Sequence, residues 1–152
     1  MITHLEVILR LVLAVLLSGL VGLEREVKGR AAGFRTHILV CTGSTLVMLT
    51  CVFLGRGSGP FDTHMAAQVV SGIGFLGAGT IIQFRDSVRG LTTAASVWAA
   101  AGIGLAVGAG FYVGAVSATL IVLIVLFLLS NFERRVGSKG KSMQGLNGPE
   151  TG

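Results

Sequence analysis

Polar side chains able to form a site lie where apolar stretches of the sequence begin or end. Carboxylates and arginines can pair, carboxylate oxygens can hold a hydrated cation, and threonines can cap helices. Eight residues are candidates for one polar cluster: Glu24, Arg25, Glu26, Arg35, Thr36, Arg89, Thr92 and Thr93. The alternative is that they are ordinary interfacial anchors and helix caps, with Thr36 and either Thr92 or Thr93 as N-caps.

Helix periodicity predicts how the carboxylates of this cluster are oriented. Small residues recur at steps of four along the first apolar stretch and share one helix face: Ala14, Ser18 and Gly22. Glu26 continues that column, so we expect Glu26 to face the other helices and Glu24 to point elsewhere. Arg35 or Arg89 would then pair with one of these carboxylates between helices.

The glycine-rich segment 72–79 matches the glycine spacing of a dinucleotide-binding loop. Such a loop must follow a strand and open a helix, whereas this segment lies inside an apolar stretch, so we exclude nucleotide binding. Small residues instead favour close contact between membrane helices, and an unwound segment lining a cavity is the alternative. The expected helix-packing residues are Gly72, Gly74, Gly77, Gly79, Ser96, Ala100 and Gly104.

Histidines and carboxylates form no convincing catalytic or metal-binding pattern in the sequence. His4 and His64 are expected on one side of a membrane and His37 on the other. The seven carboxylates avoid the middle of every apolar stretch: Glu6, Glu24, Glu26, Asp62, Asp86, Glu133 and Glu150. Magnesium prefers an octahedral oxygen site, which in mid-membrane would need backbone carbonyls, Gln or Thr. We expect no enzyme activity and no resident cofactor, and magnesium binding stays open.

Composition assigns these residues to a membrane protein. Hydrophobic residues make up 52% of the chain and charged residues 12%, against roughly 25% charged residues in soluble domains. A spanning helix needs about 20 apolar residues. Five stretches qualify or nearly qualify: about Leu5 to Leu23, Ile38 to Leu54, Met65 to Phe84, Thr93 to Val107 and Phe111 to Ser130. We predict an all-α membrane protein with five transmembrane helices.

Lys and Arg predict the orientation of these helices. They are concentrated after the first, third and fifth stretches. Cytoplasmic loops are enriched in basic residues, so the N-terminus is predicted outside and the C-terminus inside, as in a multi-pass inner-membrane protein. The net charge of +5 reflects these loops and not nucleic-acid binding. Residues 1–130 are predicted to form the membrane domain, and residues 131–152 a short basic, disordered cytoplasmic tail.

Small-residue faces also predict how the helices associate. They occur on the first, third and fourth stretches, which we expect to form a tight bundle with the fifth helix at its periphery. The same faces, with few exposed polar groups, favour a homodimer in the lipid bilayer. Similar short motifs before the second and fourth stretches raise the alternative of a parallel internal repeat.

Four segments, in this order, resemble the MgtC/SapB family of bacterial inner-membrane proteins. They are GLERE at 22–26, GFRTH at 33–37, QVVSGIGFLGAG at 68–79 and VRGLTTAA at 88–95. The similarity covers about residues 5–130, which is the predicted membrane domain. Many family members add a soluble C-terminal domain, where this sequence is expected to have only the short tail.

This resemblance implies a role in magnesium limitation, acid stress and, in pathogens, survival inside host cells. The family is often described as magnesium transporters, and inhibition of the proton-driven ATP synthase is the competing account. We expect a regulatory protein that binds another membrane complex, such as ATP synthase, through its helices. The alternative is a transporter of magnesium or of another ion or small solute, which mid-membrane carboxylates would have favoured.

Overall fold

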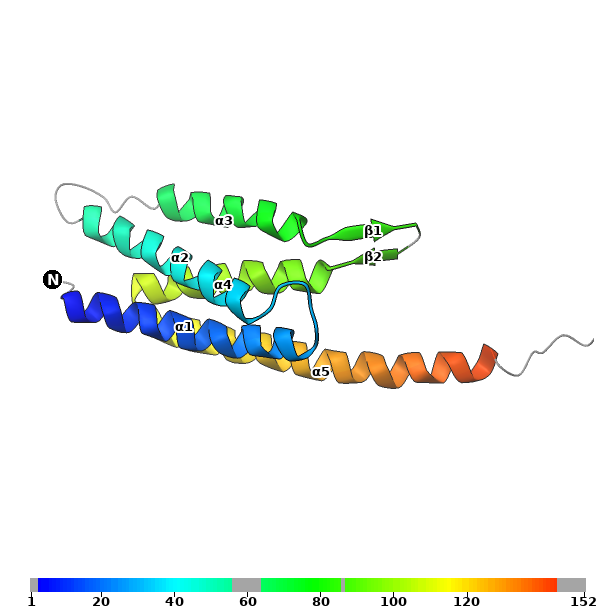
Figure 1. Ribbon diagram of the computed structural model, residues 1–152. Helices are drawn as coiled ribbons and strands as arrows, with labels where there is room; N and C mark the ends of the chain where they lie inside the picture. Colours follow the sequence, from blue (N-terminus) through cyan, green and yellow to red (C-terminus); the bar gives the residue numbers. More distant parts are fainter. Residues whose placement is uncertain (1–2, 56–63, 86, 145–152) are drawn as a thin grey trace, which may run out of the picture.

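A computed structural model describes residues 3–55, 64–85 and 87–144, with side chains as far as residue 128 (Figure 1). The described residues form five helices and one short antiparallel hairpin. In chain order these elements are α1 (His4–Val27), α2 (Phe34–Leu54), α3 (His64–Ala78), β1 (Ile82–Phe84), β2 (Ser87–Arg89), α4 (Leu91–Ala109) and α5 (Tyr112–Gln144). The helical class is therefore as predicted, and the hairpin is an addition to it.

Three of the described helices are long and apolar enough to cross a membrane. These are α1, α2 and α4. The apolar helical segments His64–Ala78 and Tyr112–Leu128 are shorter. With 15 residues α3 is about 22 Å long, less than the roughly 30 Å of a bilayer core. The membrane character follows from the three long helices, and the five-span topology stays a prediction.

The sequence predicted that the third apolar stretch remains helical to Phe84, but α3 ends at Ala78. Its last turn tightens where the N–H of Thr80 bonds to the carbonyl of Gly77 at 3.0 Å. The Thr80 hydroxyl donates to the same carbonyl at 2.8 Å. The chain then turns back as a hairpin in which Gln83 is paired with Val88. The β-branched residues at this point, among them Ile82 and Val88, favour extended backbone over helix.

The fifth helix continues past Ser130, where the predicted span ended. It reaches Gln144 and so includes the first part of the segment predicted as a disordered tail. Residues 145–152, and with them Glu150, lie outside the described residues. A separate cytoplasmic tail stays a prediction.

Helices α1, α2 and α4 form the centre of the bundle, whereas α3 packs on α4 and α2 at its edge (Figure 1). The predicted tight bundle of α1, α3 and α4 is therefore wrong, because α2 occupies the place expected for α3. One apolar cluster joins α1, α2, α4 and α5 through Ala14, Leu17, Cys41, Ile103, Val107 and Ala115. Large apolar side chains on the other face of α5 are exposed, including Val113, Leu120 and Ile121.

Glycines on α4 let α2 approach closely. A Cβ atom at Gly104 would overlap the carbonyl oxygen of Cys41, and one at Gly108 would lie 2.6 Å from the Cβ of Met48. Ser96 and Ala100, on the same helix, are buried as well. The face of α4 predicted for helix packing is thus the one that packs, with α2 as its main partner.

The glycines of α3 divide into two groups. A Cβ at Gly77 would lie 3.5 Å from the Cβ of Ala94, so Gly77 does face α4. At Gly79 it would meet only backbone of its own turn. At Gly72 and Gly74 it would meet nothing within 4 Å. The packing role predicted for Gly72 and Gly74 is therefore wrong within the described part of this chain, because no neighbouring helix lies against either position.

Candidate functional site

Glu24 and Arg25 are buried at the end of α1, although both are charged. Glu24 is 6% exposed and Arg25 is 2% exposed. Nη1 of Arg25 lies 3.4 Å from Oε2 of Glu24, and Nζ of Lys28 lies 2.5 Å from Oε1. Nε and Nη2 of Arg25 have no hydrogen-bond partner within the described part of the chain. Such a buried charge is tolerated only next to a counter-charge, so Glu24 is essential to this arrangement.

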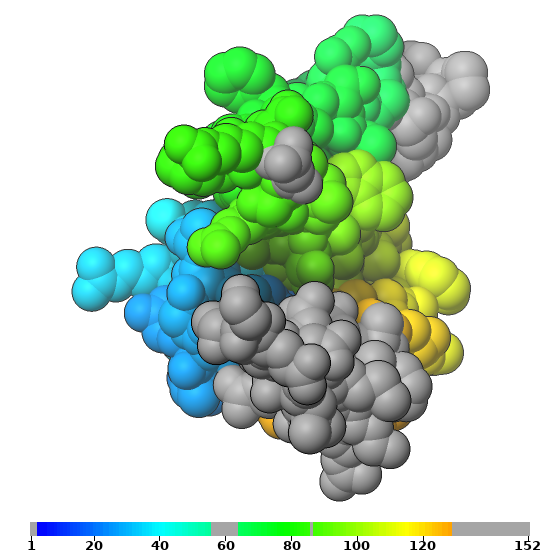
Figure 2. Space-filling model, turned by 90° about the vertical axis from the view of Figure 1, so that its right-hand side faces the viewer, coloured from blue at the N-terminus to red at the C-terminus, as the bar shows by residue number. Residues whose placement is uncertain are grey.

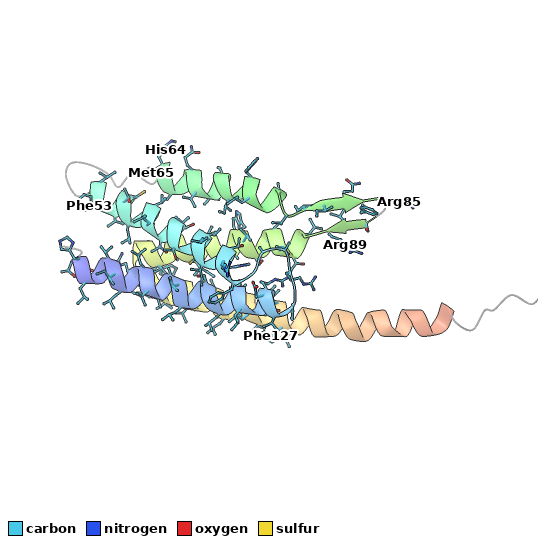
Figure 3. The ribbon with its side chains drawn as sticks, viewed as in Figure 1. Phe53, His64, Met65, Arg85, Arg89 and Phe127 are labelled. Atoms are coloured by element: carbon cyan, nitrogen blue, oxygen red, sulfur yellow. The ribbon has the colours of Figure 1, made fainter. Side chains whose placement is uncertain are left out.

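Helix α5 contacts Lys28, the second ion-pair partner of Glu24. Lys28 donates to the carbonyl of Leu126 at 3.0 Å, and its Nζ lies 5.1 Å from the ring centre of Phe127. Figure 3 shows Phe127 beside the end of α1. Lys28 was not among the predicted cluster residues, but its position four residues after Glu24 is the usual spacing of a helical ion pair.

The predicted orientations of Glu24 and Glu26 are reversed. Successive helical residues turn by about 100°, so steps of four drift by about 40° each, and Glu26 lies about 120° from Ala14. By the same geometry Arg25 lies about 20° from Ala14, which is fully buried. Glu26 is exposed, and Arg25 continues the buried face.

Glu26 nevertheless connects two helices. Its Oε2 accepts the backbone N–H of Phe34, the first residue of α2, at 2.9 Å. A carboxylate at this place satisfies a free N–H and favourably meets the positive end of the helix dipole. The N-cap itself is Gly33, which makes no side-chain bond. The prediction of Thr36 as N-cap is therefore wrong, because Glu26 fulfils that function from α1.

Among the described residues, Arg35 and Arg89 do not form the predicted interhelical ion pairs with Glu24 or Glu26. Ion pairs involving Glu24 in the described part of the chain come from its own helix, from Arg25 and Lys28. Arg35 and Thr36 are exposed at the start of α2, and the structure does not bring them to Glu24. The physical reason is that the carboxylates are already engaged by nearer groups.

His37 is a site residue that the predicted cluster omitted. It is fully buried, with Nδ1 2.8 Å from the carbonyl of Gly33 and Nε2 3.1 Å from Oγ of Ser96. The Ser96 hydroxyl in turn donates to the carbonyl of Thr93 at 2.8 Å. This chain of bonds ties the start of α2 to the start of α4. The signal was a histidine directly before an apolar stretch, since ionisable residues in or beside membrane helices usually face the bundle interior.

The remaining cluster residues line a separate cavity at the start of α4. Arg89, Thr92 and Thr93 line it together with Arg30, from the α1–α2 connection, and its volume is about 420 Å³. The N-cap of α4 is Gly90, without a side-chain cap, so the prediction of Thr92 or Thr93 as N-cap is wrong. Figure 2 views this end of the bundle, with the hairpin beside the α1–α2 connection. The predicted single cluster is thus divided into two groups, and Arg35 and Thr36 belong to neither.

A third polar contact lies at the opposite end of the bundle. Arg10 of α1 is buried, pairs with Glu6, and donates from Nη1 to the carbonyl of Gly108 at 2.6 Å. Gly110, with φ of 84°, ends α4 in the left-handed conformation that leaves this carbonyl accessible. A cation at a helix C-terminus complements the negative end of the helix dipole. Arg10 therefore anchors α1 to α4.

Metal ligands are not clustered in the part of the chain that the structure describes. No group of three or more His, Cys, Asp and Glu residues there could hold a metal ion. Asp62 and Asp86 lie outside the described residues, and the side chain of Glu133 is not described. Magnesium binding stays an open prediction.

Apolar helices that bury charged residues at both ends define the class of a helical membrane protein. The chain belongs to the MgtC family, whose sequence profile matches residues 11–135. The family membership predicted from the four motifs is thereby confirmed.

Relatives in this family are similar over most of the chain. "Protein MgtC" of Salmonella typhimurium (strain LT2) is 43% identical over 138 residues, which are 91% of this chain and 58% of that protein. "Putative magnesium transporter YhiD" of Escherichia coli K12 is 37% identical over 145 residues, which are 91% of this chain and 67% of that protein. This chain thus spans only part of the length of both relatives. No solved structure matches it.

Proposed function

We propose that this chain is a regulatory inner-membrane protein of magnesium homeostasis, which acts by binding a helix of another membrane protein along α3. The family and the names of its relatives support the link to magnesium. The single observation that carries the helix-binding role is the exposed side of α3, where Phe75 points outward and Gly72 and Gly74, on either side of it, have open space before them.

A glycine position is suited to a helix partner because membrane helices attract each other mainly by close packing. Where a side chain is missing, the backbone of a partner helix can approach closely and gain van der Waals contacts. Phe75, which is 83% exposed, and Leu76 adjoin Gly74 and offer apolar surface to the same partner. Since α3 is held to the bundle mainly through its other side, docking there leaves the core of α1, α2 and α4 undisturbed.

Transport is the second candidate function. The name of the relative, "Putative magnesium transporter YhiD", favours it, as does the buried carboxylate of Glu24. Both oxygens of that carboxylate are, however, engaged by Arg25 and Lys28. A cation passing this point would have to displace one of these two positive side chains.

The test of the helix-binding role compares two glycines that have the same open surroundings. Gly74→Leu fills the open space next to Phe75 on α3, and Gly102→Leu places the same side chain in open space on α4. We expect Gly74→Leu to abolish photocrosslinking from a probe at position 75 in native membranes and to impair growth at low magnesium. Gly102→Leu should leave both unchanged.

Each result of this comparison has a definite meaning. Equal crosslinking and growth of Gly74→Leu and the wild type would refute the proposal. If crosslinks form only to a second copy of the chain, the helix that binds α3 belongs to a homodimer and not to another protein. Magnesium influx into liposomes that hold the purified chain, above that of empty liposomes, would establish the transport alternative.

A further inference from the structure

The cavity at the start of α4 is basic and polar, unlike the apolar surface around it. Two guanidinium groups border it, from Arg30 and Arg89, and so do the hydroxyl-bearing residues Thr92 and Thr93. Its volume of about 420 Å³ lies in the range of small-molecule sites, about 300–1,000 Å³. No carboxylate is among the described residues that line it.

The backbone that forms this cavity depends on Gly90. Its φ of 93° is left-handed, and a Cβ there would overlap the carbonyl oxygen of Thr80. This close approach directs the chain from the hairpin straight into α4. The first helical hydrogen bond of α4 runs from the N–H of Ala94 to the carbonyl of Gly90 at 2.9 Å. The N–H groups of residues 91–93 precede it and are available to a ligand.

Thr93 is an independent sign that a ligand is accommodated here. The residue is only 3% exposed, and it lines the cavity. Among the described residues its hydroxyl has no hydrogen-bond partner, although buried hydroxyls normally have one. Thr42 also has a buried hydroxyl without a partner in the described part of the chain, but Thr42 does not line this cavity, whereas Thr93 does. A ligand in the cavity would provide the missing partner.

These features select an anion with several oxygen acceptors. A helix N-terminus offers N–H groups and a positive dipole end, and arginines bind phosphate oxygens in a bidentate manner. The positive charges of Arg30 and Arg89 are not balanced by any ion pair in the described part of the chain. A phosphate group combines the required negative charge with the number of acceptors.

The depth of the cavity allows two sources of phosphate. The spanning helix α4 begins at Leu91, so the cavity lies at the level where the apolar span ends. Phospholipid headgroups occupy this level, and basic pockets between helices bind them. A soluble phosphate compound would reach the same place from the aqueous side.

We propose that Arg30, Arg89, Thr93 and the N-terminus of α4 form a phosphate-binding site, occupied by an anionic lipid headgroup or a soluble phosphate. The site is distinct from the face of α3 and does not depend on the helix-binding role. Both sources share the same chemistry, and the experiment separates them.

The experiment uses the full chain in a neutral, phosphate-free detergent, with two ligands. One arm follows binding of phosphatidylglycerol by native mass spectrometry, with phosphatidylcholine as the neutral comparison. The other arm follows the thermal stabilisation by inorganic phosphate, with chloride at equal ionic strength. The variants are Arg30→Gln, Arg89→Gln, their double variant and Thr93→Val. The matched control is Arg85→Gln, which removes the same charge at the tip of the hairpin and outside the cavity (Figure 3).

We expect at least one arm to show specific binding by the wild type. Each single arginine variant should weaken it about tenfold, because one charge-assisted contact is lost. The double variant should abolish it, and Arg85→Gln should retain it. Thr93→Val should weaken binding without lowering the melting temperature of the unliganded protein, since the hydroxyl has no protein partner to lose.

The arm that responds identifies the source. A response to phosphatidylglycerol alone assigns the headgroup, and a response to inorganic phosphate alone assigns a soluble ligand. Absence of specific binding in both arms would overturn the proposal, and so would an Arg85→Gln effect as large as that of Arg89→Gln. Should Thr93→Val fail to fold, the exposed arginine variants still decide the question.

Discussion

The hydroxyl of Thr45 on α2 lies 2.9 Å from the carbonyl oxygen of Gly104 on α4, 59 positions further along the chain. The same hydroxyl is also 2.9 Å from the carbonyl of Cys41 in its own helix. A hydroxyl can reach across the two helices only because Gly104 has no side chain to separate them. This hydrogen bond links α2 to α4 in the centre of the bundle, and two predictions follow from it.

The first prediction concerns the space at Gly104. Gly104→Ala adds a methyl group that would overlap the backbone of α2, so we expect the free energy of unfolding to fall by about 1–3 kcal/mol. Gly102→Ala, two residues away in open space, is the control. It should be neutral or should stabilise the helix by up to about 1 kcal/mol. Chemical unfolding in detergent micelles measures both, and equal effects would contradict the close approach.

A second prediction tests the hydrogen bond itself. Thr45→Val keeps the shape of the side chain and removes its hydroxyl, so stability should fall by about 0.6 kcal/mol, and by no more than about 1.7. Thr50→Val removes a hydroxyl that donates only within α2, to the carbonyl of Leu46. Melting curves of the two purified variants should therefore differ, with Thr45→Val the less stable. The opposite order would show that the bond between the helices contributes nothing.

The buried charges at the end of α1 supply a third prediction. Glu24→Gln leaves the guanidinium of Arg25 buried without its counter-charge, which should cost about 3–5 kcal/mol. Glu26→Gln keeps an oxygen that can accept the N–H of Phe34, so its cost should be about 1 kcal/mol or less. Urea unfolding of both variants checks this order.

A double variant serves as the control for this third prediction. Glu24→Gln combined with Arg25→Gln removes both charges, so it should be more stable than Glu24→Gln alone. If Glu26→Gln proved the more damaging single change, the assignment of Glu24 as the buried partner would be wrong.

Orientation in the membrane is the subject of the fourth prediction. The basic residues predict that the hairpin faces the cytoplasm and that the α4–α5 connection faces outward. The native thiols of Cys41 and Cys51 are buried, so introduced cysteines can be read against a low background. In intact cells an impermeant maleimide should label Phe111→Cys and not Ser87→Cys. Labelling in the reverse pattern would invert the topology.

Much of the fold was predictable because its determinants are local. Hydropathy located all five helices, since the length of an apolar stretch is a property of neighbouring residues. The small-residue face of α4 was also correct, because Ser96, Ala100 and Gly104 share a face at helical spacing. The end of α3 was missed because the strand preference around Ile82 and Val88 competes with hydropathy, which does not distinguish helix from strand.

The candidate site was only partly predictable, for geometric reasons. Arg89, Thr92 and Thr93 do meet at one cavity, as their common depth implied. The predicted directions of the Glu24 and Glu26 side chains were the reverse of those observed. The cause is that each step of four residues turns about 40° away from the starting face, and this drift accumulates along α1. Arg30 was missed because it lies in a connection whose path is set by contacts with α3 and α4, such as that of Ala32 with Ile73 and Val97.

The sequence by itself determined the helical membrane class and the family, because apolar length and short motifs are read along the chain. Only the tertiary structure decided that α2 and not α3 packs against Gly104, and that no described helix packs against Gly72 or Gly74. It also decided that Arg30 and Arg89 share one cavity. The reason is that several helices here carry small residues, so hydropathy alone does not indicate which helix packs against which. The choice between them is made by the fit of particular atoms, such as the Thr45 hydroxyl on the Gly104 carbonyl.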